Sequence, residues 1–195
     1  ANYRFDPGTA AWVSEYFRML ATADAIACIS EHSLRAIVDR LRREASLVTV
    51  VAHPGGDHIP VMEPNPPQRL RFCRVGTLEA RKRPVEILNT FTAAIDSGLD
   101  ADLVYVGRRA PSSAVINDSI DAAISAGYPV AWIEDATDNQ VIDVMTTSSI
   151  FLSVGIEGYG IPVLESIRVG TPVLYDGSQP AADLMEGKGA LRIEG

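Results

Sequence analysis

Two glutamates, Glu157 and Glu165, lie eight residues apart in the stretch "SVGIEGYGIPVLESIRVGTPVLYDG", residues 153–177. Glu157 precedes a predicted helix, and Glu165 lies just over one turn inside it. Two interpretations are open. The pair contacts two different parts of one elongated ligand, or the two are solvated acids beside a helix start, where negative charge is favourable without any function. Spacing alone favours the second interpretation.

The loop between these two acids has a composition suited to an anion or polar ligand. Gly158 and Gly160 allow backbone N–H groups to approach a ligand closely. Pro162 suits the first turn of the following helix. The sequence therefore predicts a site for an anion or polar ligand at this helix N-terminus, whichever interpretation of the two acids holds.

A second loop, "GTLEARKRP", carries three consecutive cations, Arg81, Lys82 and Arg83, just before another predicted helix. Cations are normally disfavoured at a helix N-terminus, where an anion is favoured. A bound phosphate or diphosphate would resolve this conflict. The alternative is a solvated basic cluster that pairs with Glu79 or Glu86. The loop matches neither the P-loop pattern nor the G-x-G-x-x-G dinucleotide pattern.

Both loops belong to a regular alternation of strands and helices. Short, almost continuously apolar runs alternate with amphipathic segments, which is typical of a parallel sheet covered on both faces. We predict an α/β fold with a Rossmann-like, doubly wound parallel sheet. Ligands of such sheets bind beyond the carboxyl ends of the strands, so four loops are candidates for the site: residues 76–83, 107–112, 134–138 and 154–161.

Composition excludes several classes of function. The formal net charge is −8, so a nucleic-acid-binding face is not expected. No apolar run approaches the roughly 20 residues of a membrane span. Cys28 and Cys73 lie in apolar runs and are interpreted as buried thiols of a protein in a reducing compartment. His53 and His58 with Asp57 could suggest metal ligands, but solvated imidazoles in a glycine-rich turn are the simpler interpretation.

Three stretches in this order, "VGTLEARKRPVEILNTF", "LVYVGR" and "EGYGIPVLESIRVGTPVL", give the chain a specific resemblance. It resembles the C-terminal, donor-binding domain of retaining GT-B glycosyltransferases, the E-x7-E family of glycosyltransferase group 1. The match runs from about Leu47 to the end. The resemblance implies that residues 47–195 are a nucleotide-sugar-binding domain, the C-terminal half of a GT-B fold. Residues 1–46 then correspond to a remnant of the N-terminal domain or an interdomain segment.

The resemblance also implies roles for individual residues. Lys82 matches the lysine that holds the donor diphosphate, Glu165 the acid that binds the ribose hydroxyls, and Glu157 its partner facing the donor sugar. Lys82 and Glu157 are therefore the residues expected to act in catalysis. Further donor contacts are expected from Gly76, Thr77, Arg81, Glu134 near the base, and the stretch Gly158, Tyr159, Gly160 and Ile161.

Two positions depart from the family pattern. Many members have an arginine directly after the first glycine, where this chain has Thr77, so Arg81 is a candidate substitute. A proline usual before the second loop is replaced by Ser153. These departures leave open a degenerate, non-catalytic scaffold or partner module. A nucleotide-sugar epimerase related to GT-B proteins is a third alternative, although it has no reason to carry the E-x7-E loop.

The implied activity is retaining transfer of a sugar from a nucleotide-diphosphate-sugar, with GDP-mannose preferred, to a glycan or lipid-linked acceptor in surface polysaccharide synthesis. No metal or other cofactor is expected. The protein is expected to be cytoplasmic, with the missing N-terminal half supplying the acceptor site and any contact with the inner face of the membrane. Because we expect this chain to be part of a longer protein, we predict that it binds the donor but transfers little sugar alone.

Overall fold

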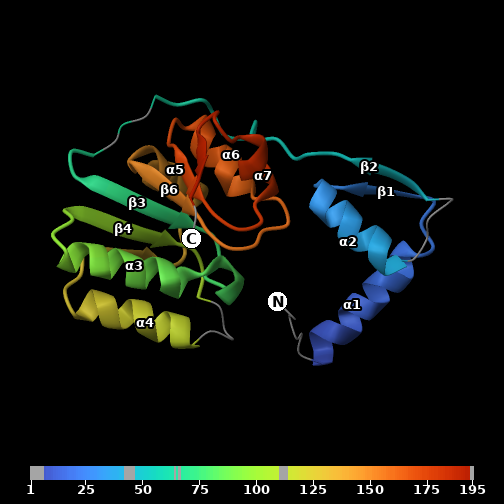
Figure 1. Ribbon diagram of the computed structural model, residues 1–195, viewed down its shortest axis with the longest axis horizontal. Helices are drawn as coiled ribbons and strands as arrows, with labels where there is room; N and C mark the ends of the chain where they lie inside the picture. Colours follow the sequence, from blue (N-terminus) through green and yellow to red (C-terminus); the bar gives the residue numbers. More distant parts are fainter. Residues whose placement is uncertain (1–6, 42–46, 64, 66, 110–113, 194–195) are drawn as a thin grey trace. The chain divides into compact units, whose positions relative to one another are not determined.

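A computed structural model describes residues 7–41, 47–63, 65, 67–109 and 114–193 (Figure 1). The chain divides into two compact units, Ala1–Pro54 and Gly55–Gly195. The boundary between the units lies eight residues after the 46/47 domain boundary that the sequence predicts, because the strand at Val48–Val51 pairs within the first unit. The predicted helix end at residues 42–45 and the predicted loop and helix residues 110–113 lie outside the described residues.

The described residues of the first unit form two helices and a two-stranded parallel sheet. Helix α1 spans Pro7–Leu20, β1 Ala25–Cys28, α2 Glu31–Leu41 and β2 Val48–Val51. The strands are parallel, with Ala25 opposite Val48. Ser30 caps α2 as predicted, because its hydroxyl accepts a hydrogen bond from the Ser33 amide at 3.0 Å. No helix in the described part of the chain is both long and apolar enough to cross a membrane.

The second unit is built on a six-stranded, fully parallel sheet with the order β5-β4-β3-β6-β7-β8. The chain moves outward from β3 to β5 and then returns to start again at β6, which makes the sheet doubly wound, as predicted. The elements are β3 Leu70–Val75, η1 Ala80–Lys82, α3 Pro84–Asp96, β4 Ala101–Val106, α4 Ala114–Ser125, β5 Val130–Ile133, α5 Asp138–Thr146, β6 Ile150–Ser153, α6 Ile161–Arg168, β7 Val173–Tyr175, α7 Pro180–Leu184 and β8 Ala190–Arg192.

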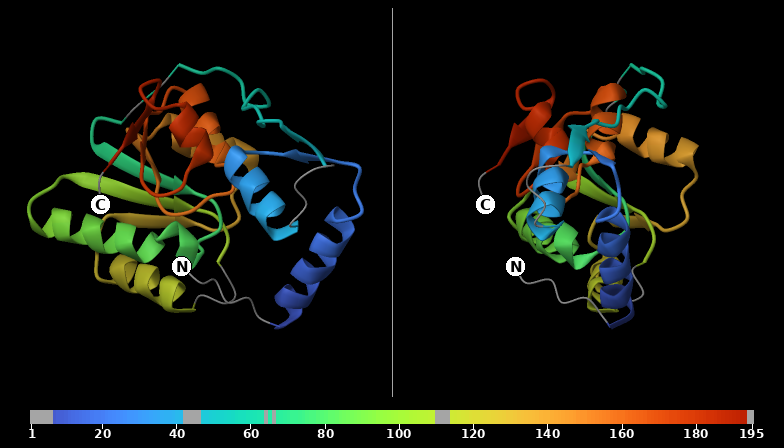
Figure 2. Two further views of the ribbon diagram at one scale, coloured as in Figure 1. Left: turned by 45° about the vertical axis from the view of Figure 1, so that its right-hand side comes forward. Right: turned by 90° about the vertical axis from the view of Figure 1, so that its right-hand side faces the viewer.

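Helices cover both faces of this sheet (Figures 1 and 2). Strand β4 shows how the alternation of side chains creates two cores. Leu103 and Tyr105 pack with residues of α3 and α4, whereas Val106 packs with residues of α5, α6 and α7. The two core clusters are therefore the two faces of one sheet, and the loops at its carboxyl edge are held from both sides.

Candidate functional site

The predicted ligand loops meet at the centre of the sheet. Strands β3 and β6 are neighbours there, although the chain leaves β3 toward one edge and leaves β6 toward the other. Such a topological switch point opens a crevice beyond the carboxyl ends of the two strands. The cation-bearing loop follows β3 and the Glu157 loop follows β6, so the fold brings the two predicted loops together.

The loop after β3 places the Lys82 ammonium beside Gly76, the residue that follows β3. Gly76 has a φ of +115°, and a Cβ at that position would lie 2.9 Å from Lys82 Nζ, so the glycine leaves space for the ammonium group. Arg83 takes the left-handed conformation, with a φ of 52°, between η1 and α3. This turn separates the directions of neighbouring side chains, and Lys82 and Arg83 contact different acids.

Glu157 contacts two cations of the basic loop, Arg81 and Lys82. Its Oε2 accepts a hydrogen bond from Arg81 Nη1 at 2.7 Å, and its Oε1 lies 3.0 Å from Lys82 Nζ. Arg81 also donates to Glu79 and to the Ile156 carbonyl, each at 2.6 Å. The predicted pairing of the basic cluster with Glu79 is thus present. Lys82 is buried, at 8% exposed, and so is most of the Glu157 side chain, at 14% exposed, whereas the side chains of Arg81 and Arg83 are 29% and 44% exposed.

Burial and charge shift the proton affinities of this group. Burial would raise the pKa of Glu157, but the hydrogen bond from Arg81 and the charge of Lys82 outweigh it and hold that pKa below its ordinary value. Burial lowers the pKa of Lys82, although the charge of Glu157 opposes the shift. The positive charges of Arg74 and Arg81 lower it further. An added anion would raise the pKa of Lys82 again.

The lowered pKa of Lys82 predicts how anion binding depends on pH. A bound diphosphate stabilises the charged ammonium, so affinity is highest where free Lys82 is protonated. It falls as pH rises through the lowered pKa, before the ordinary lysine range of about 10.4 is reached. Titration calorimetry with a nucleotide-diphosphate-sugar from neutral to alkaline pH measures this fall. Lys82→Arg, which stays charged, should flatten it, and an equal fall in this variant would contradict the prediction.

Arg74 belongs to the same group of charges, although it was not among the predicted site residues. It lies in β3 and is 2% exposed, with Nη2 at 4.0 Å from Glu157 Oε1. Burial lowers its pKa to about 10, and the charge of Glu157 opposes the shift. The signal was an arginine in the otherwise apolar run "FCRV", where a charge is not expected in a buried strand.

Glu165 lies apart from the cation cluster, on α6. Its Oε1 is 2.8 Å from Nε2 of His58. The His58 side chain is 56% exposed, in agreement with the solvated imidazole predicted there, and the contact with Glu165 was not predicted. The Glu165 side chain is 16% exposed, so it lies in a shielded but accessible position. The two acids therefore have different partners, and of the two only Glu157 is a partner of the basic loop.

The Glu157 loop itself is fixed by backbone contacts. The Tyr159 carbonyl accepts a hydrogen bond from Ala181 at 2.8 Å, and its side chain is buried in the core on the α6 face. Gly160, with a φ of +100°, precedes the first helical residue, Ile161. Gly158 is exposed, and a Cβ there would meet nothing within 4 Å. Tyr159 thus anchors the loop through both its side chain and its carbonyl.

A hollow of about 410 Å³ lies at the carboxyl ends of β3, β4 and β5. Glu134 lies at this hollow and pairs with Arg109 at 2.8 Å. The Arg109 guanidinium stacks over Trp132 at 4.1 Å, and the indole donates to the Gly107 carbonyl at 2.9 Å. The predicted residues Gly76, Thr77 and Glu134 all line this hollow, together with Val75, Val106, Gly107, Arg108, Asp135, Ala136 and Val141.

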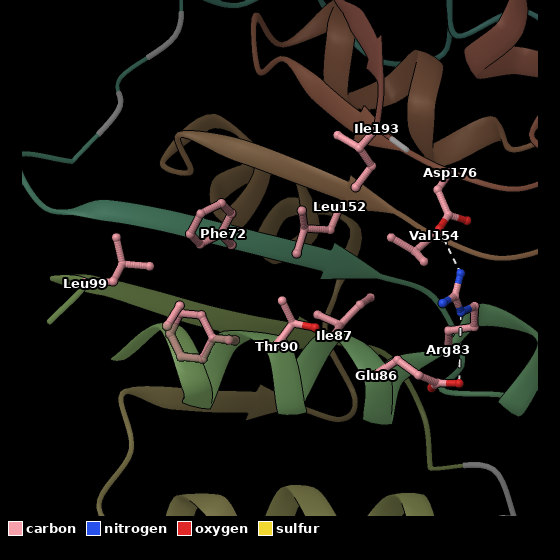
Figure 3. A pocket seen from close by; sticks show the side chains of 12 residues that line it. Phe72, Arg83, Glu86, Ile87, Thr90, Leu99, Leu152, Val154, Asp176 and Ile193 are labelled. Carbon is pink, nitrogen blue, oxygen red and sulfur yellow. Dashed lines mark hydrogen bonds and ion pairs between the residues drawn. The ribbon is translucent and has the colours of Figure 1, made fainter. Parts of the chain in front are cut away.

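A second hollow, of about 360 Å³, differs in chemistry (Figure 3). Apolar side chains of α3, β3 and β6 line most of it. Arg83 lies at its rim, where Nη1 is 2.7 Å from Asp176 and Nε 4.0 Å from Glu86, so the predicted alternative partner Glu86 is present. Arg81 and Lys82 contact Glu157, whereas Arg83 contacts Glu86 and Asp176. Among the described residues, the one cation lining this hollow is thus paired with two acids, which does not favour binding of an anion.

No protein-family model matches the chain. The serotype-specific mannosyltransferase WbdA of Escherichia coli is 27% identical over 105 residues, which cover 53% of this chain and 13% of WbdA. A second WbdA sequence from Escherichia coli gives the same identity and is covered over 12% of its length. The chain thus spans a small part of the curated relatives it matches.

Solved glycosyltransferase structures share the fold. HepE of Anabaena, in complex with UDP and glucose, has a TM-score of 0.72 at 14% identity, with 95% of this chain and 54% of HepE covered. The pneumococcal O-GlcNAc transferase GtfA, in complex with UDP and GlcNAc, has a TM-score of 0.73 at 11% identity, with 95% and 37% covered. The C-terminal domain of the group 1 protein LpcC from Francisella tularensis has 0.56 at 16%, with 72% and 80% covered. The predicted resemblance to the GT-B fold is confirmed.

Proposed function

We propose that the second unit binds a nucleotide-diphosphate-sugar and is the donor-binding part of a retaining glycosyltransferase. The observation that carries this proposal is the meeting of Lys82, Arg81 and Glu157 at the switch point between β3 and β6. Three cations, Arg74, Arg81 and Lys82, face two acids, Glu79 and Glu157, in this partly buried cluster. The cluster therefore keeps one positive charge in excess, which suits a diphosphate. The fold shared with the UDP complexes of HepE and GtfA supports the same ligand class.

The remaining predicted contacts match the parts of one elongated donor. The hollow lined by Thr77 and Glu134 has the volume and mixed polarity for a nucleotide base. Glu165, a carboxylate with accepting oxygens, suits the ribose hydroxyls. Glu157 and the Gly158–Ile161 loop then face the sugar. This arrangement corresponds to the ligand-binding interpretation of the two acids.

The chemistry proposed for this site is stabilisation of a departing diphosphate. Lys82 supplies positive charge where negative charge develops as the sugar–phosphate bond breaks. Transfer with retention on one face of the sugar lets the leaving diphosphate help to deprotonate the acceptor, so no carboxylate is required as a nucleophile. The acceptor, a glycan or a lipid-linked sugar, is held by other parts of the whole protein. The weak likeness to a mannosyltransferase favours GDP-mannose as the donor.

Titration calorimetry of this chain with UDP, GDP, UDP-glucose and GDP-mannose tests the proposal. We expect binding of one nucleotide class, with GDP and GDP-mannose preferred over the uridine ligands. Preference for the uridine ligands would contradict the mannose assignment and leave the donor site standing. Absence of binding of all four at millimolar concentration would overturn the donor site itself.

The ribose contact can be tested separately at Glu165. Loss of a hydrogen bond to a charged group costs about 1.5–3 kcal/mol, so Glu165→Gln should weaken nucleotide binding by about tenfold or more. The 2′,3′-dideoxy nucleotide should bind the wild type and the variant equally. Glu86→Gln, at an exposed position of α3, is the matched control. Equal losses for the ribose and dideoxyribose ligands would show that Glu165 acts elsewhere.

A further inference from the structure

Arg74 occupies a place that packing does not explain. A guanidinium in a buried strand is costly unless its donors are paired. Its Nη1 donates to the Val75 carbonyl at a long 3.4 Å, and neither Nε nor Nη2 has a hydrogen-bond partner among the described residues. Tyr105 is paired with Arg74 in the register of β3 and β4, and its hydroxyl donates a hydrogen bond to the Pro84 carbonyl at 2.8 Å. A charge has been buried with most of its donors unused.

The unused donors lie beside Glu157. Arg74 Nη2 is 4.0 Å from Oε1, the same oxygen that Lys82 Nζ contacts at 3.0 Å. The other oxygen, Oε2, is bound to Arg81. Lys82 and Arg74 thus both lie near Glu157 Oε1. Of these two cations, Lys82 is within hydrogen-bonding distance and Arg74 is not.

This arrangement affects how the Lys82 ammonium could move from Glu157 to a bound anion. Moving the ammonium from Glu157 to a diphosphate would remove one partner from a largely buried carboxylate, which is strongly unfavourable when nothing replaces it. A movement of Arg74 of about 1 Å would bring Nη2 to the 2.7–2.9 Å of a charge-assisted hydrogen bond. Lys82 could then leave without loss of pairing at Oε1.

We propose that Arg74 is a positioning residue that takes over Glu157 Oε1 when a diphosphate draws Lys82 away. The inference rests on the proposed donor site. It assigns to Arg74 no contact with the ligand. Arg74 acts through Glu157, so its effect on ligand binding depends on the carboxylate being present. This dependence separates the exchange of partners from simple attraction of Arg74 for an anion.

A double-mutant cycle on the 195-residue chain tests the exchange, with GDP and UDP as ligands in titration calorimetry. Arg74→Met should weaken binding of the preferred nucleotide by about tenfold or more, because Lys82 then leaves Oε1 unpaired. In the Glu157→Gln background there is no carboxylate to leave unpaired, so Arg74→Met should change affinity less than about twofold. Circular dichroism and thermal unfolding of each variant report whether the fold is kept.

Arg74→Lys keeps the charge and should retain more affinity than Arg74→Met. If Arg74→Met does not fold, Arg74→Lys carries the same cycle, with a loss in the wild-type background that disappears in the Glu157→Gln background. Equal losses in both backgrounds would show direct attraction to the ligand and overturn the proposal, as would unchanged affinity in the wild-type background. Failure of the wild type to bind either nucleotide would instead overturn the donor site, and the exchange with it.

Discussion

Lys82→Ala is expected to weaken binding of a nucleotide diphosphate by about ten- to a hundredfold. The ammonium is buried between Gly76 and Glu157, and a hydrogen bond between charged groups contributes about 1.5–3 kcal/mol. The alanine should cost little folding stability, because Glu157 keeps the 2.7 Å hydrogen bond from Arg81 and gains space to approach Arg74. Titration calorimetry measures the affinity, and urea unfolding measures the stability.

Lys188→Ala is the matched control for this change. Lys188 is the only other lysine in the sequence, and it is exposed. The substitution changes the net charge by the same amount, so it accounts for the general effect of charge on anion binding. We expect Lys188→Ala to leave affinity within about twofold of the wild type, since surface charges at a distance are screened. Equal losses in the two variants would contradict a specific role for Lys82.

The fold could be predicted from the sequence because local patterns determine most of it. Runs such as the one that forms β4 are apolar and short, and the glycines and prolines between them mark the turns. The boundary between the compact units lies eight residues beyond the predicted domain boundary, because the pairing of β2 with β1 joins segments separated by a helix. Short α7, with Pro180 as its first residue, was not predicted, because five residues give no periodicity.

The site could be predicted only where a loop carries its own signal. Lys82 and Glu157 are conspicuous within their loops, and the switch point explains why they meet. Arg74 and His58 were missed as members of the site because their partners are remote in sequence. His58 contacts Glu165 across 107 residues, and Arg74, in β3, lies near Glu157 of the loop that follows β6. A buried charge in a strand signals function only after the neighbours that pair with it are known.

The close contact between the two loops predicts the largest effect on folding. Gly155 has a φ of +99°, and a Cβ there would lie 2.1 Å from the Arg81 carbonyl oxygen. That carbonyl also accepts the 2.9 Å hydrogen bond from the Ile156 amide, which joins the β6 loop to the β3 loop. Alanine cannot fit unless the loops separate. Gly155→Ala should therefore lower the free energy of unfolding of the second unit by about 4 kcal/mol or more, which is the size of loss that severe steric conflict causes.

Gly98→Ala separates this steric conflict from backbone strain. Gly98 has the same φ of +99°, but a Cβ there would meet nothing within 4 Å. Its alanine variant should lose only the roughly 1–2 kcal/mol of a left-handed alanine. The difference between the two free energies of unfolding, measured in urea, is then the cost of forcing the loops apart. Because Lys82 and Glu157 lie on those loops, Gly155→Ala should also abolish nucleotide binding where Gly98→Ala preserves it. Equal losses of stability would mean that the two loops are not held in contact at Gly155.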